Sequence, residues 1–289
     1  MNVGLLGTGL MGYPMASRLL SQGHKVWVYN RTPAKALPLK DQGAVIARDG
    51  SEVISAAGFI ILMLADAAAI RDVLFKTKGS FEGRTIIQMG TISPRESQEL
   101  SEEVIRRKGC YLECPVLGSK AEAQAGELIL MAGGVVGDFE NCRELLKCLG
   151  PEPRFVGPVG SAAALKLALN QLIASLAAAF ALSLGFVERQ RVPVELFMTV
   201  LRESTLYAPM FDKKLPRWLK RDYENPNFSV KHLLKDINLF LKEAESRGLD
   251  ASSLKGVKNV VEAVRSGPLV DKDYTALYQI INPPPSDRS

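Results

Sequence analysis

Three glycines near the beginning of the chain constrain its fold more than any other feature. Gly7, Gly9 and Gly12 have G-x-G-x-x-G spacing and follow the apolar run NVGLL. A segment of helical periodicity comes next, and a second apolar run occupies residues 25–29. This order of strand, glycine turn, helix and strand is the setting in which the spacing binds a dinucleotide, with the pyrophosphate on the helix N-terminus. We therefore expect a dinucleotide site here rather than a purely structural turn.

The residues of the turn have separate predicted roles. Gly7 permits the tight turn, Gly9 leaves room for the pyrophosphate, and Gly12 lets the helix pack close to the strand. Leu10 and Met11 lie between these glycines, so we expect them to contact the cofactor as well.

The end of the second strand predicts which dinucleotide binds. An NAD site usually places an acidic residue there, whereas this chain has Asn30, Arg31 and Thr32. Arg31 can pair with a 2′-phosphate, Asn30 and Thr32 can donate hydrogen bonds to it, and no carboxylate repels it. NADP(H) is therefore favoured over NAD(H). The alternative is an arginine on a solvated loop.

The same alternation continues downstream. Strands are predicted from apolar runs at 59–64, 85–89, 110–114 and 128–133, and helices between them at 67–75, 94–108 and 138–148. The pattern indicates an α/β fold with a Rossmann-type doubly wound sheet. Ligands of such sheets bind at the carboxyl ends of the strands, so the residues expected to line the dinucleotide are Met63, Leu64, Ala65 and Thr91.

Residues 161–190 form the longest apolar run. The stretch 167–187 carries no charge and is long enough to cross a bilayer. It is also rich in alanine, lacks an aromatic belt at its ends, and contains the polar residues Asn170, Gln171, Ser175 and Ser183. We therefore expect a long helix, capped by Ser161 and buried on most sides by protein, in place of a membrane span.

Strand signals stop near residue 160, and helical segments continue to about residue 280. The sequence thus predicts a nucleotide-binding domain at 1–160, a long interdomain helix leading into an all-helical C-terminal domain at 161–282, and a disordered tail at 283–289. Pro193 and Ser229 are expected to mark further helix starts.

Composition argues against several function classes. The 289 residues include 36 Lys and Arg against 31 Asp and Glu, an excess too mild and too scattered for nucleic-acid binding. The four cysteines lack zinc-type spacing and only two histidines, His24 and His232, are present, so no metal site is expected. Reduced thiols and the strand at the very start of the chain favour a cytoplasmic enzyme, or one of an organelle matrix if a presequence was removed.

Lys166 is a cation near the start of the apolar helix. Asn170 follows it by about one turn, so the two side chains share a face, and the amide oxygen can orient the ammonium. A positioned ammonium can stabilise the charge that forms on a carbonyl oxygen during hydride transfer, and can supply the proton. Position alone leaves open that Lys166 simply extends to water.

Four segments in order give the chain a resemblance to a known family. They are GLLGTGLMGYPMASRL at the glycine turn, ECPVLGSKAEAQAGEL at 113–128, GPVGSAAALKLALN at 157–170 and FSVKHLLKDINL at 228–239. The sequence resembles the β-hydroxyacid dehydrogenases, a family that includes 3-hydroxyisobutyrate dehydrogenase, tartronate semialdehyde reductase and the glyoxylate/succinic semialdehyde reductases. The match runs nearly end to end.

The resemblance implies roles for individual residues. Lys166 matches the catalytic lysine and Asn170 its partner, and both would contact substrate. Gly118 and Ser119 match a loop that holds a substrate carboxylate. Lys235, beside Asp236, matches a lysine that reaches cofactor and substrate, and Thr91 matches a hydroxyl on the nicotinamide side.

Two departures from the family pattern concern the substrate. Leu117 stands where many members have serine after the Pro-Val pair, and Gly90 replaces another common serine. The pocket is therefore expected to favour a less polar or longer substrate.

The implied activity is NADPH-dependent reduction of small aldehydes or 2-oxo acids, of the glyoxylate, succinic semialdehyde or tartronate semialdehyde type, with Lys166 as proton donor. The alternatives are a 3-hydroxyisobutyrate-type dehydrogenase working in the oxidative direction, an imine-reductase-like relative, and a non-catalytic NADPH-binding protein. Apolar faces in the helical region predict a homodimer or homotetramer, with neither nucleic acid nor membrane as partner.

Overall fold

The computed structural model describes residues 1–76, 79–265 and 267–284, and it divides into two compact units, Met1–Leu167 and Ala168–Ser289. The division falls inside one long helix, α7 (Ser161–Arg189). The tail predicted at 283–289 lies outside the described residues from position 285 onward.

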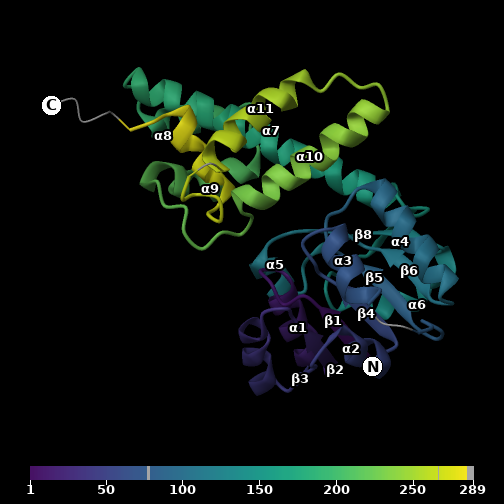
Figure 1. Ribbon diagram of the computed structural model, residues 1–289. Coiled ribbons are helices and arrows are strands. Elements are labelled where there is room, and N and C mark those ends of the chain that lie inside the picture. The colour runs from purple at the N-terminus through teal and green to yellow at the C-terminus, as the bar shows by residue number, and fades with distance from the viewer. Residues whose placement is uncertain (77–78, 266, 285–289) are drawn as a thin grey trace. The chain divides into compact units, whose positions relative to one another are not determined.

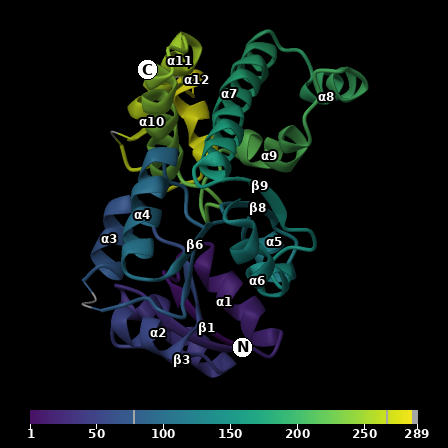
Figure 2. The same ribbon diagram turned by 90° about the vertical axis from the view of Figure 1, so that its right-hand side faces the viewer.

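The first unit is built on a sheet with helices on both faces (Figures 1 and 2). Its strands are β1 (Asn2–Leu6), β2 (Lys25–Tyr29), β3 (Val45–Ile46), β4 (Phe59–Leu62), β5 (Thr85–Gln88), β6 (Cys110–Glu113), β7 (Val116–Leu117), β8 (Ile129–Gly134) and β9 (Arg154–Gly157). Their order is β3-β2-β1-β4-β5-β6-β8-β7, with β9 paired to β8. Pairing is parallel from β3 to β6, and β8 runs antiparallel to β6. The strand order reverses between β1 and β4, which is where ligands of doubly wound sheets bind.

Two apolar cores hold the helices of this unit to the sheet. Side chains alternate along each strand, so Leu5 of β1 packs into one core and Leu6 into the other. The helices are α1 (Gly12–Ser21), α2 (Gly50–Ala56), α3 (Ala67–Leu74), α4 (Pro94–Arg106), α5 (Lys120–Ala125) and α6 (Val136–Lys147). Side chains just before them fix several starts: Asp49 Oδ1 accepts from Glu52 N at 2.9 Å, and Asp66 Oδ1 from Ala69 N at 2.8 Å.

The predicted doubly wound sheet is confirmed. The apolar runs assigned to strands form β4, β5, β6 and β8, and the helices expected between them are α3, α4 and α6. Short elements went unpredicted, namely β3, α2, β7, α5 and β9. A capping box, Ser119-x-x-Glu122, was the available signal for α5.

The described elements of the second unit are helical. They are the rest of α7 and α8 (Val194–Glu203), α9 (Pro209–Lys220), α10 (Val230–Ser246), α11 (Ser252–Arg265), a 3-10 turn at Tyr274–Leu277 and α12 (Tyr278–Ile281). Phe180 of α7 stacks on Phe211 of α9 at 4.5 Å between ring centroids, and Trp218 lies at 4.8 Å. Pro193 and Ser229 directly precede α8 and α10, as predicted.

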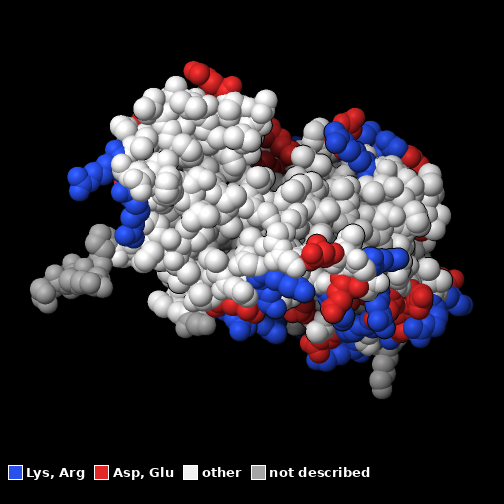
Figure 3. All heavy atoms as spheres, turned by 90° about the horizontal axis from the view of Figure 1, so that it is seen from above, with Lys and Arg blue, Asp and Glu red and all other residues white. Residues whose placement is uncertain are grey.

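One face of α7 is not covered, which corrects the expectation of a helix buried on most sides. Only 39 % of its most apolar window is buried, although its length and hydropathy would suit a membrane span. Leu182 and Phe186 are 63 % and 64 % exposed, and Leu196 and Val200 of α8 are also exposed. The face drawn in Figure 3 includes a broad area without Lys, Arg, Asp or Glu side chains, and in Figure 2 α8 stands apart from α10 and α11. The helices of the second unit therefore pack against one side of α7 and leave another side open.

Candidate active site

The glycine turn connects β1 to α1. Gly7 has a φ of 103°, and a Cβ there would lie 2.3 Å from the carbonyl oxygen of Met63. A Cβ on Gly12 would lie 1.8 Å from the Gly7 carbonyl oxygen, so α1 can begin this close to β1 only with glycine. Gly9, in contrast, has open space within 4 Å of its Cβ position. The turn thus combines two packing glycines with one open position, as a pyrophosphate requires.

The start of α1 suits an anion. Its first turn contains no acidic side chain, so its positive end is not neutralised locally. Leu10 is 39 % exposed and Met11 is partly buried against the core. These residues fit a dinucleotide at this turn.

Asn30 links the glycine turn to the end of β2. Its Oδ1 accepts a hydrogen bond from Thr8 N at 3.1 Å, and its Nδ2 donates to Thr32 O at 2.9 Å. Asn30 therefore fixes the two loops, a role that differs from the expected donation to a phosphate. Arg31 and Thr32 are exposed beside it, and no carboxylate stands among these three residues.

The loops after β4 and β5 lie together at the carboxyl edge of the sheet. The side chain of Gln88 exchanges hydrogen bonds of 2.9 and 3.1 Å with the backbone of Gly90. A Cβ on Gly90 would lie 2.7 Å from the carbonyl oxygen of Leu64, which explains a glycine at this position. Met63, Leu64 and Thr91 are half-buried here, at the edge where the cofactor is expected.

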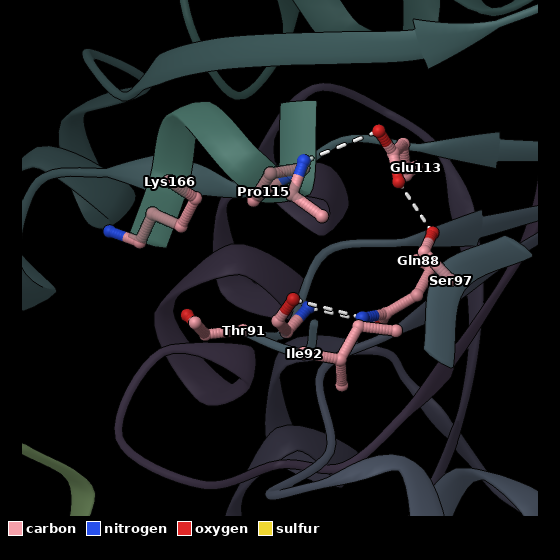
Figure 4. Close-up of a pocket in the computed structure, with 9 residues that line it drawn as sticks. Gln88, Thr91, Ile92, Ser97, Glu113, Pro115 and Lys166 are labelled. Atoms are coloured by element: carbon pink, nitrogen blue, oxygen red, sulfur yellow. Dashed lines mark hydrogen bonds between the residues drawn. The ribbon is translucent and has the colours of Figure 1, made fainter. Parts of the chain in front are cut away.

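A pocket in the first unit contains Lys166 (Figure 4). We call it the Lys166 pocket, and its lining residues are Gln88, Gly90, Thr91, Ile92, Ser97, Glu113, Pro115, Ala163 and Lys166. Lys166 is only 9 % exposed. In Figure 4 its amine and the Thr91 hydroxyl extend to the same side of the view, away from Glu113. The structure thus brings together two residues that the sequence placed in the site separately.

Glu113 ends β6 and is buried in the Lys166 pocket. Its Oε1 accepts hydrogen bonds from the backbone N–H groups of Gly160, Ala162 and Ala163 at 2.8, 2.8 and 3.2 Å. Its Oε2 accepts from Ser97 Oγ at 2.5 Å. Burial raises the pKa of Glu113, and these donors act in the opposite direction. The expectation for Ser161 needs correction, because α7 begins at Ser161 itself and Glu113 supplies a carboxylate to its first N–H groups.

Asn170 belongs to a buried polar group of the second unit. Its Nδ2 donates to Asp236 Oδ2 at 2.6 Å, and Asp236 Oδ1 forms an ion pair with Lys235 Nζ at 3.0 Å. The Oδ1 atom of Asn170 is buried and accepts no hydrogen bond. A buried acceptor without a donor is unfavourable, and a ligand donor would relieve this.

His232, in the first turn of α10, has a structural contact. Its Nδ1 lies 2.8 Å from Ser229 Oγ, which also accepts from His232 N at 3.4 Å. Burial lowers the pKa of His232, and the nearby positive charge of Lys235 adds to this effect. His232 therefore strengthens the start of α10 as a neutral imidazole.

In the loop predicted to hold a substrate carboxylate, the donors of Ser119 are bound to the carboxylate of the chain's own Glu122. Ser119 N donates to Glu122 Oε2 at 2.7 Å, and the Ser119 hydroxyl donates to the same oxygen. Gly118, with a φ of 141°, packs against Glu122 and Leu128, and Leu117 ends β7 half-buried. The side chain of Glu122 thus occupies donors that the resemblance assigns to substrate.

Comparison with known proteins identifies the family. Residues 2–157 match the family described as the NAD binding domain of 6-phosphogluconate dehydrogenase, and residues 160–281 match that described as NAD-binding of NADP-dependent 3-hydroxyisobutyrate dehydrogenase. The chain is 32 % identical to glyoxylate/succinic semialdehyde reductase 1 of Arabidopsis thaliana, across 97 % of the chain and 98 % of that protein. The chain belongs to the 3-hydroxyisobutyrate dehydrogenase family.

Solved structures share the fold of this 3-hydroxyisobutyrate dehydrogenase family member. A 3-hydroxyisobutyrate dehydrogenase from Salmonella typhimurium superposes with a TM-score of 0.87 at 22 % identity, covering 97 % of this chain and 99 % of that one. A reductive aminase from Aspergillus terreus, in complex with NADPH and ethyl levulinate, gives 0.67 at 25 % identity, covering 96 % and 98 %. The resemblance to β-hydroxyacid dehydrogenases is confirmed, and the protein is an NAD(P)-binding oxidoreductase of the type that acts on CH–OH groups.

Several pocket residues of this family member were not predicted from the sequence, above all Gln88, Ser97 and Glu113. Gln88 and Glu113 are the last residues of β5 and β6 and face each other in the strand register. Polar residues at the carboxyl ends of parallel strands were a usable signal for a site. Ser97 lies inside α4, where nothing in the sequence sets it apart.

Proposed function

We propose that this protein is an NADPH-dependent reductase of small aldehydes or 2-oxo acids, with Lys166 as proton donor. The observation that carries the proposal is the burial of Lys166 in a pocket at the carboxyl ends of β5 and β6, beside Thr91. The ammonium of this lysine lines the edge of the sheet where the family member's dinucleotide is expected, within reach of a carbonyl bound beside the nicotinamide.

The chemistry of the proposed reduction balances with one proton from the chain. Bound NADPH would supply a hydride to the carbonyl carbon. The Lys166 ammonium donates a hydrogen bond to the carbonyl oxygen, stabilises the negative charge that forms there, and transfers a proton to it. Lysine is then reprotonated from solvent.

The proposed preference for NADPH rests on the end of β2. Arg31 is exposed there and no acidic residue accompanies it, so a 2′-phosphate meets a cation and no repulsion. We expect kcat/KM with NADPH to exceed that with NADH by at least about 100-fold, the equivalent of roughly 2.7 kcal/mol. Arg31→Ala should remove most of this difference. Equal kcat/KM values with NADPH and NADH in the wild type would contradict the proposed preference for NADPH.

Leu117 and Glu122 support a substrate that is less polar at its far end. Leu117 offers no side-chain donor, and Ser119 donates both from its backbone and from its hydroxyl to Glu122. A substrate carboxylate placed at this loop would be repelled by the carboxylate of Glu122. Among aldehydes of equal length, we propose that a neutral chain end is accepted at least as well as a carboxylated one.

A substrate panel tests the proposal. NADPH oxidation is followed with glyoxylate, succinic semialdehyde and butanal, and with a ketone plus a primary amine, while NADP+ reduction is followed with 3-hydroxyisobutyrate. Turnover of the aldehydes that Lys166→Ala abolishes supports the proposal. Turnover only with the ketone and amine would favour an imine-reductase-like activity, turnover only with 3-hydroxyisobutyrate the oxidative direction, and NADPH binding without turnover a non-catalytic protein.

We also propose that the protein is a homodimer or homotetramer. The exposed face formed by Leu172, Leu182 and Phe186 of α7 with Leu196 and Val200 of α8, which we call the α7–α8 face, supports this. Its side chains are large, apolar and exposed, as expected of a surface that a second copy covers.

A further inference from the structure

Glu113 has no chemical step in the proposed reduction, yet it is among the most completely bonded side chains of the Lys166 pocket. Three backbone N–H groups of residues 160–163 and the Ser97 hydroxyl donate to its two oxygens. Ser97 Oγ lies 2.9 Å from the Tyr111 hydroxyl, which continues the chain of hydrogen bonds into the core. Because all four direct partners are donors, the arrangement suits an ionised carboxylate.

The backbone donors belong to the beginning of α7. The first N–H groups of a helix have no partner within it, and they carry a partial positive charge that a carboxylate offsets. Most such caps come from a residue just before the helix, but Glu113 precedes its partners by 47 to 50 positions in sequence. This contact therefore attaches the start of α7 to the end of β6.

Neighbouring backbone leaves space for this one side chain. Gly133 of β8 faces Glu113, and a Cβ there would lie 2.6 Å from Glu113 Oε1. Any larger residue at position 133 would displace the carboxylate, so two strands and two helices together define its place. Lys166 follows Ala163 by three residues, and both line the pocket.

We propose that Glu113 is a positioning residue of the active site, whose buried carboxylate holds the first turn of α7 against β6 and so fixes where Lys166 enters the pocket. The inference rests on the proposed function for Lys166. It has an electrostatic consequence, because the carboxylate is the acidic group that lines the same pocket and offsets the positive end of the helix that carries Lys166. Removing its charge disfavours the ammonium form of Lys166.

The test uses Glu113→Gln, which keeps shape and acceptor oxygen but removes the charge. Its Kd for NADPH and its KM should stay within threefold of wild type, while kcat falls about 10-fold to 100-fold because the proton donor is misplaced. The alkaline limb of its kcat/KM profile should move to lower pH by on the order of one unit. Wild type and Glu113→Gln share the other titratable groups, namely Lys235, Asp236 and His232 of α10 and Tyr111 of β6. These groups therefore cannot cause a difference in the alkaline limb between the two proteins.

Two further variants separate positioning from general stability. Glu113→Asp keeps the charge, but its side chain is shorter and holds the carboxylate farther from α7. The alkaline limb of its kcat/KM profile should therefore match wild type, while its kcat stays lowered. Asp49→Ala removes the cap of α2, away from the pocket, and should lower Tm by a few degrees with unchanged kcat and pH profile. A Glu113→Gln protein with wild-type kcat and alkaline limb would overturn the proposal. Should that variant not fold, wild-type kcat in Glu113→Asp would overturn it.

A measurement without turnover distinguishes failure of this inference from failure of the proposed function. Lys166 is acylated with acetic anhydride at a series of pH values, and the modified peptide is quantified by mass spectrometry. The midpoint should lie at lower pH in Glu113→Gln than in wild type. An unchanged midpoint would contradict the role of Glu113 even if wild-type protein proved to reduce no aldehyde.

Discussion

The two units of the protein satisfy their buried polar groups in different ways. In the first unit, Glu113 has four donors from the chain itself, and the sheet is closed by an apolar core on each face. In the second, Asn170 keeps a buried oxygen without a donor, and Leu182 and Phe186 lie exposed. The first unit thus satisfies the Glu113 carboxylate from its own chain, although Thr8 Oγ1 and Trp27 Nε1 are buried there without a hydrogen-bond partner. The exposed side chains and the Asn170 oxygen of the second unit fit the second copy and the ligand that we propose as their partners.

The largest expected effect comes from the packing glycines of the first unit. Gly12→Ala places a Cβ 1.8 Å from the Gly7 carbonyl oxygen, and since backbone must move, we expect a loss of about 3 kcal/mol or more in the free energy of unfolding. Gly9→Ala has no such contact, so its stability should stay near wild type while NADPH affinity falls at least about tenfold. Urea unfolding and NADPH fluorescence titration measure the two effects. Equal stabilities of the two variants would break the view of a tightly self-packed turn.

The second expected effect concerns the α7–α8 face of the second unit. Leu182→Glu combined with Phe186→Lys keeps the net charge and adds a favourable pair four residues apart on the helix. The molar mass from light scattering should fall to a smaller multiple of the 31.5 kDa chain, with the helical CD signal retained. Leu249→Ser, at another apolar side chain that is 62 % exposed, is the control and should keep the wild-type mass. A monomeric wild type, or an unchanged mass in the double variant, would show that this face needs no partner.

The smallest expected effect is a difference in pH response between the units. Burial lowers the pKa of His232 in the folded protein, so the unfolded chain takes up a proton first as pH falls from 7 through 6.5. The free energy of unfolding of the wild type therefore decreases as pH falls over that range. The His232→Gln variant should show a smaller decrease. Glu113 has the opposite sign, because its pKa is raised on folding and its contribution decreases as pH rises. Urea unfolding at pH 5.5 and 7.5 measures the free energy of unfolding at each pH. An equal change with pH in wild type and in His232→Gln would contradict the predicted contribution of His232.

The difference between the units also decides how much the sequence could predict. The sheet and the glycine turn were predictable, because close backbone packing leaves glycine as the residue that fits at Gly7 and Gly12. The cap of α7 was assigned to Ser161 from local sequence, whereas the group that fills this role comes from Glu113, a contact that only the tertiary fold creates. The exposed side of α7 was missed for a similar reason, since apolar periodicity does not tell a buried face of a helix from an exposed one.

The central claim is that Lys166 donates the proton in carbonyl reduction, and Lys166→Met tests it most directly. The variant keeps the length and apolar stem of the side chain, so NADPH should bind with a Kd within threefold of wild type. With saturating NADPH and succinic semialdehyde or butanal, we expect kcat to fall at least about 1,000-fold, the loss of both proton donor and charge stabilisation. A folded Lys166→Met protein that binds NADPH and keeps kcat within tenfold of wild type would contradict the account.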